Sequence, residues 1–533
     1  MNLGKLKQKS TYSDWLLPLC LMILGALLRF IYLGTVPGGI HQDESFSVLN
    51  ALGLLHEGMD TAGRVLPVYL SDWGDGQSAM YSWLLMPLFA LNGGKANLFL
   101  TRVPQAAVAV LTLWCVYCLI KRMFTRNAAL WALFALAVCP WHIMMSRWGL
   151  DANLAPGFLI FSLYFFVRGM EQEKFLPVAA LFYGLTLYCY AVIWPIVPIM
   201  LLAQIIYGLA HKKLSINKWS LLSALLLFVL ALPLLLYVLV NSEIIPEIAL
   251  PFISIPKAIG YRGSEVAFSF SEMSANLKTS LRLLAFQNTG SPYDFLLPWG
   301  LFYDIGRIFI VIGVICLLTK LVKAFLKKEF AWEYFLFVQL AGGGIVCLLV
   351  SARLHQVNAL FIPLVLCEAY GLRATAQFLY SKRQIFGKAF TGLVTAVYLI
   401  CLVLFQKDYY TDYKELVNAY FAIGIKECVE YAMEQCEETG INTITVEKGA
   451  QWPRLLLYTE TLPSEYLRTV QYDVPPAPAA FDTHGLHINT RINYDSINNE
   501  SIYIIYFIDV PTFEKDFTLT QFHDWYVAVP KDT

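Results

Sequence analysis

Long apolar runs, separated by short polar segments, dominate the chain from Trp15 to Phe405. Each run approaches the roughly 20 residues that a helix needs to cross a bilayer, and none shows the alternation of a membrane barrel. Because the runs are continuous and Leu-rich, they predict a polytopic α-helical membrane protein. The candidate helices cover residues 15–34, 78–92, 101–120, 127–141, 153–169, 175–190, 191–209, 219–240, 301–319, 333–351, 356–373 and 386–405.

The Lys and Arg residues of the short loops indicate which runs cross, because they mark the cytoplasmic side. Lys5, Lys7 and Lys9 place residues 1–14 in the cytoplasm. If segment 78–92 spans, the later basic loops fall outside; if it does not span, they all fall inside. These loops contain Lys121, Arg122, Arg126, Lys212, Lys213, Lys320, Lys323, Lys327 and Lys328. The rule favours about 11 transmembrane helices with 78–92 as an interfacial helix; a short span there is the alternative.

Charge divides the chain into a membrane domain, residues 15–405, and a C-terminal domain, residues 406–533. Residues 1–406 carry 30 Lys+Arg and 19 Asp+Glu, and residues 407–533 carry 9 and 20, which together make the 39 of each sign. An acidic surface argues against nucleic acid as a partner of the C-terminal domain. With 11 spans, this domain is extracytoplasmic, as are loop 35–100 with its interfacial helices and loop 241–300.

The C-terminal domain mixes helical and strand-like patterns. A helix is expected over 412–438, and the strand-like runs are INTITVE (441–447), SIYIIYFI (501–508) and WYVAV (525–529). PPAPAA (475–480) is expected to be a loop. We therefore expect a small α/β domain.

Two cysteines, Cys428 and Cys436, lie in the expected helix of the C-terminal domain. They are roughly 12 Å apart along that helix, which is too far for a disulfide. The sequence shows no metal-ligand spacing and indicates no cofactor, so a requirement for a divalent metal stays open.

Polar residues at a membrane boundary are costly and therefore indicate function. The first cluster is His41-Gln42-Asp43-Glu44, directly after the first span. Two adjacent carboxylates in a low dielectric could supply a general base with a raised pKa and a positioning group. The alternative is that Asp43 and Glu44 simply open the helix that follows them, since carboxylates favour helix N-termini.

Two further clusters lie at the outer ends of later spans. Arg147 and Asp151 are four residues apart in the short loop 142–152 and could simply pair with each other. Segment SARLHQVN contributes Arg353, which could bind a lipid phosphate or extend toward the headgroups. Weaker candidates are His41, His142, Arg262, His355 and Asn358.

The order of these clusters resembles the GT-C glycosyltransferases that use polyprenyl-phosphate sugars, within the bacterial branch related to protein O-mannosyltransferases and lipid A aminoarabinose transferase. The resemblance covers roughly residues 15–405. It is carried by HQDESFSVLNALGLLHEG, GRVLPVY, TRVPQA, PWHIMMSRWGLDANL and ARLHQVNALFIPLVL. The chain has Asp75-Gly76-Gln77-Ser78 where the aminoarabinose transferase has a Lys-Pro-Pro motif, and it lacks the β-trefoil insertion of the eukaryotic mannosyltransferases. Both departures leave the acceptor open.

The resemblance implies a role for each matching residue. Asp43 matches the catalytic acidic residue that deprotonates the acceptor hydroxyl, with Glu44 beside it, and Asp151 matches a second acidic residue. Arg353 matches a donor-phosphate ligand, with His355 and Arg147 as further candidates. His41, His142, Arg262 and Asn358 are candidate substrate contacts.

The sequence therefore predicts a hexosyl- or pentosyltransferase of the cell membrane. It would move a sugar, with inversion, from a polyprenyl-phosphate donor to an extracytoplasmic glycan, lipid or protein. The alternative is a transporter or flippase of a lipid-linked saccharide. Transporters carry inverted repeats and polar sites near the midplane, and Glu368, inside a predicted span, is the one feature that favours this alternative.

Overall fold

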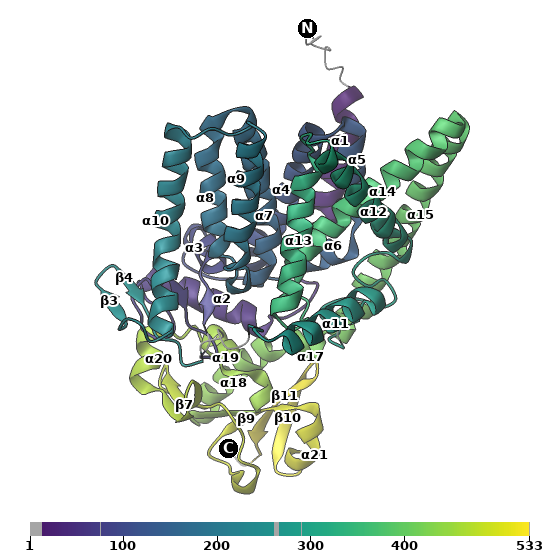
Figure 1. The fold of residues 1–533 in the computed structure, drawn as a ribbon. Coiled ribbons are helices and arrows are strands. Elements are labelled where there is room, and N and C mark those ends of the chain that lie inside the picture. Colours follow the sequence, from purple (N-terminus) through teal and green to yellow (C-terminus); the bar gives the residue numbers. More distant parts are fainter. Residues whose placement is uncertain (1–12, 75, 261–265, 289, 532–533) are drawn as a thin grey trace.

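The computed structural model describes residues 13–74, 76–260, 266–288 and 290–531 (Figure 1). Every apolar run of the sequence contains a helix. These helices are α1 (Ser13–Phe30), α3 (Met80–Leu91), α4 (Leu98–Met123), α5 (Arg126–Val138), α7 (Ala155–Glu171), α8 (Leu176–Leu187), α9 (Ile196–Ala210), α10 (Lys218–Asn241), α12 (Asp304–Leu326), α13 (Glu333–Leu349), α14 (Phe361–Lys382) and α15 (Gln384–Tyr410).

Within the described residues, seven helical segments are long and apolar enough to cross a membrane. The prediction of a multi-pass membrane protein is therefore confirmed, whereas the count of 11 spans stays a prediction. The 12 residues of α3 would extend only about 18 Å. That is well short of the roughly 30 Å of a hydrocarbon core. Helix α8 is equally short, so length alone does not separate an interfacial helix from a span.

Short elements cover one end of the helix bundle (Figure 1). Helix α2 (Gln42–His56) lies across this end, as its apolar pattern suggested, and the hairpin β1 (Tyr69–Leu70) and β2 (Gln77–Ser78) follows it. Loop 241–300 adds the hairpin β3 (Ile248–Leu250) and β4 (Ile253–Ile255) and helix α11 (Phe270–Phe286), none of which was predicted. The remaining short helices are α6 (Pro140–Met145), η1 (Asp151–Leu154), η2 (Glu173–Phe175), η3 (Ala191–Ile193) and η5 (Asn358–Leu360).

The C-terminal domain is built on a seven-stranded mixed sheet with the order β10-β11-β9-β5-β8-β7-β6. Its strands are β5 (Thr443–Val446), β6 (Gln471–Val474), β7 (Ala477–Thr483), β8 (Leu486–Asn489), β9 (Ile502–Tyr506), β10 (Phe517–Phe522) and β11 (Trp525–Pro530). Strand β5 runs parallel to both of its neighbours, and every other pair is antiparallel. The α/β architecture and the three predicted strands are thus present.

Two local expectations about this domain were wrong. The expected loop 475–480 contains the start of β7, because only Pro475 and Pro476 form the turn and the following residues pair with β6. The expected helix 412–438 is broken into α16 (Asp412–Leu416), α17 (Asn418–Phe421) and α18 (Ile425–Thr439). The break lies at Ala422 and Gly424, which both have positive φ and cannot continue a right-handed helix.

The C-terminal domain is docked firmly on α2. Helix α19 (Trp452–Tyr458) packs against α2, and Phe46 and Leu49 of α2 belong to the apolar core of the C-terminal domain. The buried Arg454 guanidinium donates to the carbonyl oxygen of Ile40 at 2.9 Å. The smaller helices α20 (Pro463–Thr469) and α21 (Val510–Phe513) and the turns η6 (Lys448–Ala450), η7 (Tyr494–Ser496) and η8 (Phe507–Asp509) complete this domain.

Candidate active site

A cavity of about 830 Å³ lies between the start of α2 and the helix bundle. It is at the end of the bundle that faces the C-terminal domain. The start of α2, hairpin β1–β2, η1, η3, the end of α10 and segment 349–356 contribute to its wall. Its volume lies within the roughly 300–1,000 Å³ typical of small-molecule sites, which are mostly apolar with a few convergent polar groups. The polar lining residues are Asp43, Asp72, Gln77, Asp151, Asn241, Ser242, His355 and Gln356.

Asp43 points into the cavity because of its place in the first turn of α2. The N-cap is His41, whose Nδ1 accepts from the Asp43 amide at 3.3 Å, and Glu44 closes the capping box by accepting from the His41 amide at 2.9 Å. Neighbouring helical side chains point about 100° apart, so Glu44 faces the protein interior and Asp43 faces the cavity. The Asp43 side chain is 33% exposed.

Glu44 forms a buried ion pair beside the cavity, and its catalytic role stays a prediction. Its fully buried carboxylate pairs with Arg102 at 3.0 Å and accepts from the Gly149 amide at 2.6 Å. Burial alone would raise the pKa of Glu44, but the Arg102 charge and these hydrogen bonds outweigh it and hold the pKa below its usual value. The carboxylate therefore stays ionised and is occupied by its partners.

Asp151 forms part of the same cavity as Asp43. It begins the 3₁₀ turn η1, and its two carboxylate oxygens accept from the backbone amides of Ser78 at 3.2 Å and Ala152 at 2.7 Å. These two bonds fix the carboxylate while its edge faces the cavity. The alternative from the sequence was that Arg147 and Asp151 pair with each other, but the structure gives each of them other partners.

Arg147 is buried and does not line the cavity, so its role as a phosphate ligand stays a prediction without geometric support. Its guanidinium donates to the carbonyl oxygens of Leu28, Ile31 and Val36 at 2.8–3.1 Å and to the Tyr409 hydroxyl at 3.2 Å. These acceptors lie at the end of α1, in the loop after it and at the end of α15. Arg147 therefore ties these segments together.

The two candidates of segment 351–358 for the donor phosphate lie in different places. His355 lines the cavity, whereas Arg353 is exposed and lies outside the lining. Asn358 is buried, donates to the carbonyl oxygen of Ala152 at 2.8 Å and lies outside the cavity lining, so its role as a substrate contact stays a prediction.

The two remaining histidine candidates are also structural. His41 is buried, caps α2 and packs against Trp148, Tyr293 and Phe421. Burial lowers the pKa of His41 to about 3, so its ring is neutral. His142 is buried and its Nδ1 lies 2.5 Å from the Arg29 guanidinium. Both lie outside the cavity lining, and their roles as substrate contacts stay predictions. Arg262 lies outside the described residues.

Sequence reasoning missed three residues that matter here. Asp72 and Tyr69 line the cavity. Asp72 lies in an irregular segment with no pattern to single it out, and Tyr69 ends the quoted motif GRVLPVY, to which no role was given. Arg102 was part of a quoted motif without a role. A signal did exist for Arg102, because a charged residue near the start of an apolar span usually has a buried partner.

The fold and the cavity together define a class of protein. With 97% of this chain and 98% of the other covered, the structure superposes on ArnT from Cupriavidus metallidurans bound to undecaprenyl phosphate at a TM-score of 0.57 and 12% identity. The archaeal oligosaccharyltransferase AglB from Archaeoglobus fulgidus, in complex with an inhibitory peptide and a dolichol-phosphate, gives 0.51 and 11% over 84% and 63% of the two chains. The chain is thus a multi-pass membrane protein with the GT-C fold.

A family comparison points in the same direction for part of the chain. Residues 77–237 match the family model of dolichyl-phosphate-mannose-protein mannosyltransferase. No curated protein is significantly similar in sequence. The resemblance seen in the sequence is therefore confirmed for the fold and for this segment.

Proposed function

We propose that this protein is a membrane glycosyltransferase that moves a sugar from a polyprenyl-phosphate donor to an extracytoplasmic acceptor with inversion. The observation that carries the proposal is the cavity itself. Two carboxylates from different elements, Asp43 of α2 and Asp151 of η1, face one largely apolar space at the end of the helix bundle. Apolar walls suit a lipid-linked donor, and the carboxylates suit chemistry on a hydroxyl.

In this mechanism Asp43 is the general base. Its carboxylate accepts the proton of the acceptor hydroxyl as that oxygen bonds to the anomeric carbon of the sugar. The bond from the anomeric carbon to the phosphate oxygen breaks at the same time, and the polyprenyl phosphate leaves with the electron pair. Attack from the face opposite the phosphate inverts the anomeric centre. His355, on the cavity wall, is the proposed contact of the phosphate.

Asp151 has a supporting role in this mechanism. Its carboxylate is held by two backbone amides, so it is positioned to accept a hydrogen bond from the substrate without moving.

The comparisons support the donor class. The similar structures were obtained with undecaprenyl phosphate in one case and dolichol-phosphate in the other, and a polyprenyl phosphate matches the apolar walls here. The transporter alternative rested on Glu368, which lies outside the cavity lining and accepts a hydrogen bond from the Tyr398 hydroxyl. This partner gives Glu368 a structural role and leaves the alternative without support.

We place the cavity and the C-terminal domain on the extracytoplasmic side. Helix α1 begins at the end of the bundle away from the C-terminal domain (Figure 1), as an odd number of spans requires. The basic N-terminal segment then faces the cytoplasm under the positive-inside rule.

Sugar transfer by the purified full-length protein tests the proposal. We expect the protein in detergent to transfer sugar from a panel of undecaprenyl-phosphate monosaccharides to glycan, lipid or peptide acceptors, with the opposite anomeric configuration in the product. Lipid movement across vesicles without any transfer would support the transporter alternative. Binding of undecaprenyl phosphate itself is a separate measurement, and its absence would contradict the proposed donor class.

A further inference from the structure

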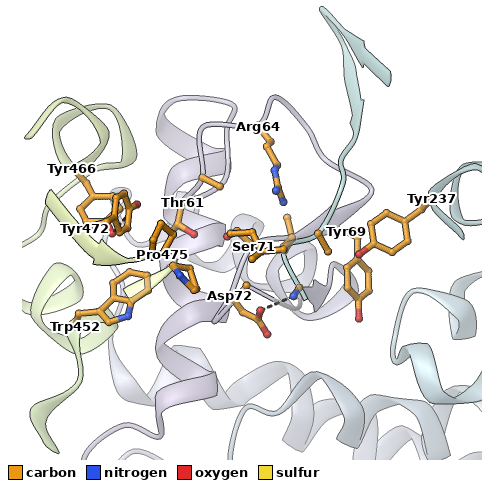
Figure 2. A pocket seen from close by; sticks show the side chains of 17 residues that line it. Thr61, Arg64, Tyr69, Ser71, Asp72, Tyr237, Trp452, Tyr466, Tyr472 and Pro475 are labelled. Carbon is orange, nitrogen blue, oxygen red and sulfur yellow. Dashed lines mark hydrogen bonds between the residues drawn. The ribbon is translucent and has the colours of Figure 1, made fainter. Parts of the chain in front are cut away.

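A second, smaller pocket of about 210 Å³ lies beside the catalytic cavity (Figure 2). Loop 61–76 forms one wall, and the C-terminal domain forms the other through α19, α20 and the turn between β6 and β7. Its volume falls below the range of roughly 300–1,000 Å³ for drug-sized ligands. It therefore fits one small group, such as a single sugar ring, rather than a lipid chain.

The two spaces share part of their wall. Tyr69, Asp72, Gly76 and Tyr237 line both the small pocket and the catalytic cavity. A group held in the small pocket therefore borders directly on the space that Asp43 and Asp151 face. None of the other described pockets both shares wall residues with the catalytic cavity and includes residues of the C-terminal domain.

The side chains of the small pocket have the chemistry that binds carbohydrates. Figure 2 shows Trp452 and Tyr472 on one side, Tyr69 and Tyr237 on the other, and Asp72 between them. Aromatic faces pack against the C–H faces of a sugar, while carboxylates bind its hydroxyl groups.

The pocket is rigid where its two walls are anchored. The buried Asp60 carboxylate accepts from the amides of Ala62, Arg64 and Ser71 at 2.9–3.0 Å and fixes the loop. On the other side, the Trp452 ring stacks on Tyr466 with centroids 5.8 Å apart and an interplanar angle of 5°. A preformed site of this kind spends little free energy on ordering its side chains when a ligand binds.

We infer that this pocket is the acceptor subsite and takes a sugar ring of a glycan or glycolipid acceptor, an inference that rests on the proposed transferase activity. The ring lies against Tyr472, its hydroxyl groups bind Asp72, and the reacting hydroxyl extends past Tyr69 toward Asp43. The C-terminal domain thereby contributes to acceptor selection through named side chains.

The test compares Tyr472→Ala with a matched control, Tyr494→Ala, in the full-length protein. Tyr472 is 41% exposed and lines the pocket, whereas Tyr494 is 48% exposed in the same domain and does not. Binding of a panel of methyl hexosides and methyl pentosides is measured by NMR titration, and binding of undecaprenyl phosphate is measured in parallel. We expect Tyr472→Ala to weaken glycoside binding by about threefold to tenfold, the range for loss of an aromatic contact. Tyr494→Ala should change the binding of neither ligand.

Each other outcome overturns a specific statement. If the wild type binds undecaprenyl phosphate but no glycoside, or if Tyr472→Ala binds glycosides normally, the subsite is wrong and the proposed function stands. If a peptide that contains Ser or Thr binds in this pocket and the glycosides do not, the proposed glycan or glycolipid acceptor is wrong. If the wild type binds neither undecaprenyl phosphate nor glycosides, the proposed donor class fails together with the subsite.

Discussion

The two sides of the first turn of α2 differ sharply in what surrounds them. On the inner side, Glu44 is fully buried with Arg102 and the Gly149 amide. On the outer side, Asp43 faces a cavity that it shares with Asp151 and His355. The two residues are adjacent in sequence and identical in charge, yet one holds the protein together and the other is available to a substrate.

The difference shows how polar residues at a membrane boundary divide into two kinds. Glu44, Arg102 and Arg147 satisfy charges and carbonyl groups that would otherwise be unpaired in an apolar setting, which costs several kcal/mol per group. Asp43 and Asp151 line the cavity instead. A polar cluster in the sequence therefore identifies the neighbourhood of the site, and helix geometry decides which members reach it.

The largest effect is expected for Asp43→Asn. Asn keeps the size of the side chain but cannot take up the proton, so turnover should fall by about 10²–10⁴-fold. Folding should be almost unaffected, because the N-cap of α2 is His41 rather than Asp43. Sugar transfer by the purified variant, with undecaprenyl phosphate binding as a check of the fold, measures this. Wild-type turnover in Asp43→Asn would remove Asp43 from the mechanism.

Glu44→Gln should instead lower the stability and leave turnover nearly unchanged. Removing one partner of a buried ion pair leaves the Arg102 charge uncompensated, which typically costs about 3–5 kcal/mol. We expect a lower thermal midpoint and a lower yield, with near-normal turnover in the fraction that stays folded. Glu437→Gln, at an exposed position of α18, is the control and should change stability by less than about 0.5 kcal/mol. A stable Glu44→Gln protein with greatly reduced turnover would return Glu44 to the catalytic residues.

Much of the membrane architecture could be predicted because it depends on a strong local signal. Apolar runs predicted the long helices of the membrane bundle, and the alternation in INTITVE and WYVAV predicted β5 and β11. Helix α11 was missed because half of its residues are polar and no long apolar run marks it. Strands β6, β7, β8 and β10 were missed because their pairing depends on long-range contacts, which short polar strands do not reveal.

The candidate site could be predicted only in part, for a related reason. The sequence placed Asp43, Asp151 and His355 near the outer end of the bundle, but it could not separate them from Glu44, Arg147, His142 and Asn358. That separation depends on which backbone carbonyls and amides are brought within 3 Å by tertiary folding. The small pocket was out of reach altogether, because Tyr69 and Trp452 are nearly 400 residues apart in the chain.

The buried His41 at the start of α2 also predicts how the stability of the protein depends on pH. Burial lowers the pKa of His41 to about 3 in the folded protein, against about 6.5 in the unfolded chain. Between these values the unfolded state binds more protons, so stability is fully present above pH 6.5 and is lost as the pH falls. The loss at pH 5 is about 2 kcal/mol. His41→Asn keeps a good N-cap without titrating, so its thermal midpoint should change less between pH 8 and 5. An equal change in both proteins would contradict a neutral, buried His41.

The smallest effect is expected for Arg353→Ala, which compares an exposed charge with a neighbouring residue of the cavity wall. Arg353 is exposed and outside the lining, whereas His355, two residues further on, is part of it. A phosphate contact from an exposed charge is screened by solvent and salt, and such contacts contribute less than about 1 kcal/mol. Arg353→Ala should therefore weaken undecaprenyl phosphate binding by less than about fivefold, and His355→Ala should weaken it more. Arg353→Lys, which keeps the charge, should bind like the wild type, and the small loss in Arg353→Ala should vanish at high salt. A loss of tenfold or more that persists at high salt would instead mean that Arg353 turns into the cavity when the donor binds, as the resemblance to lipid-phosphate-dependent transferases implies.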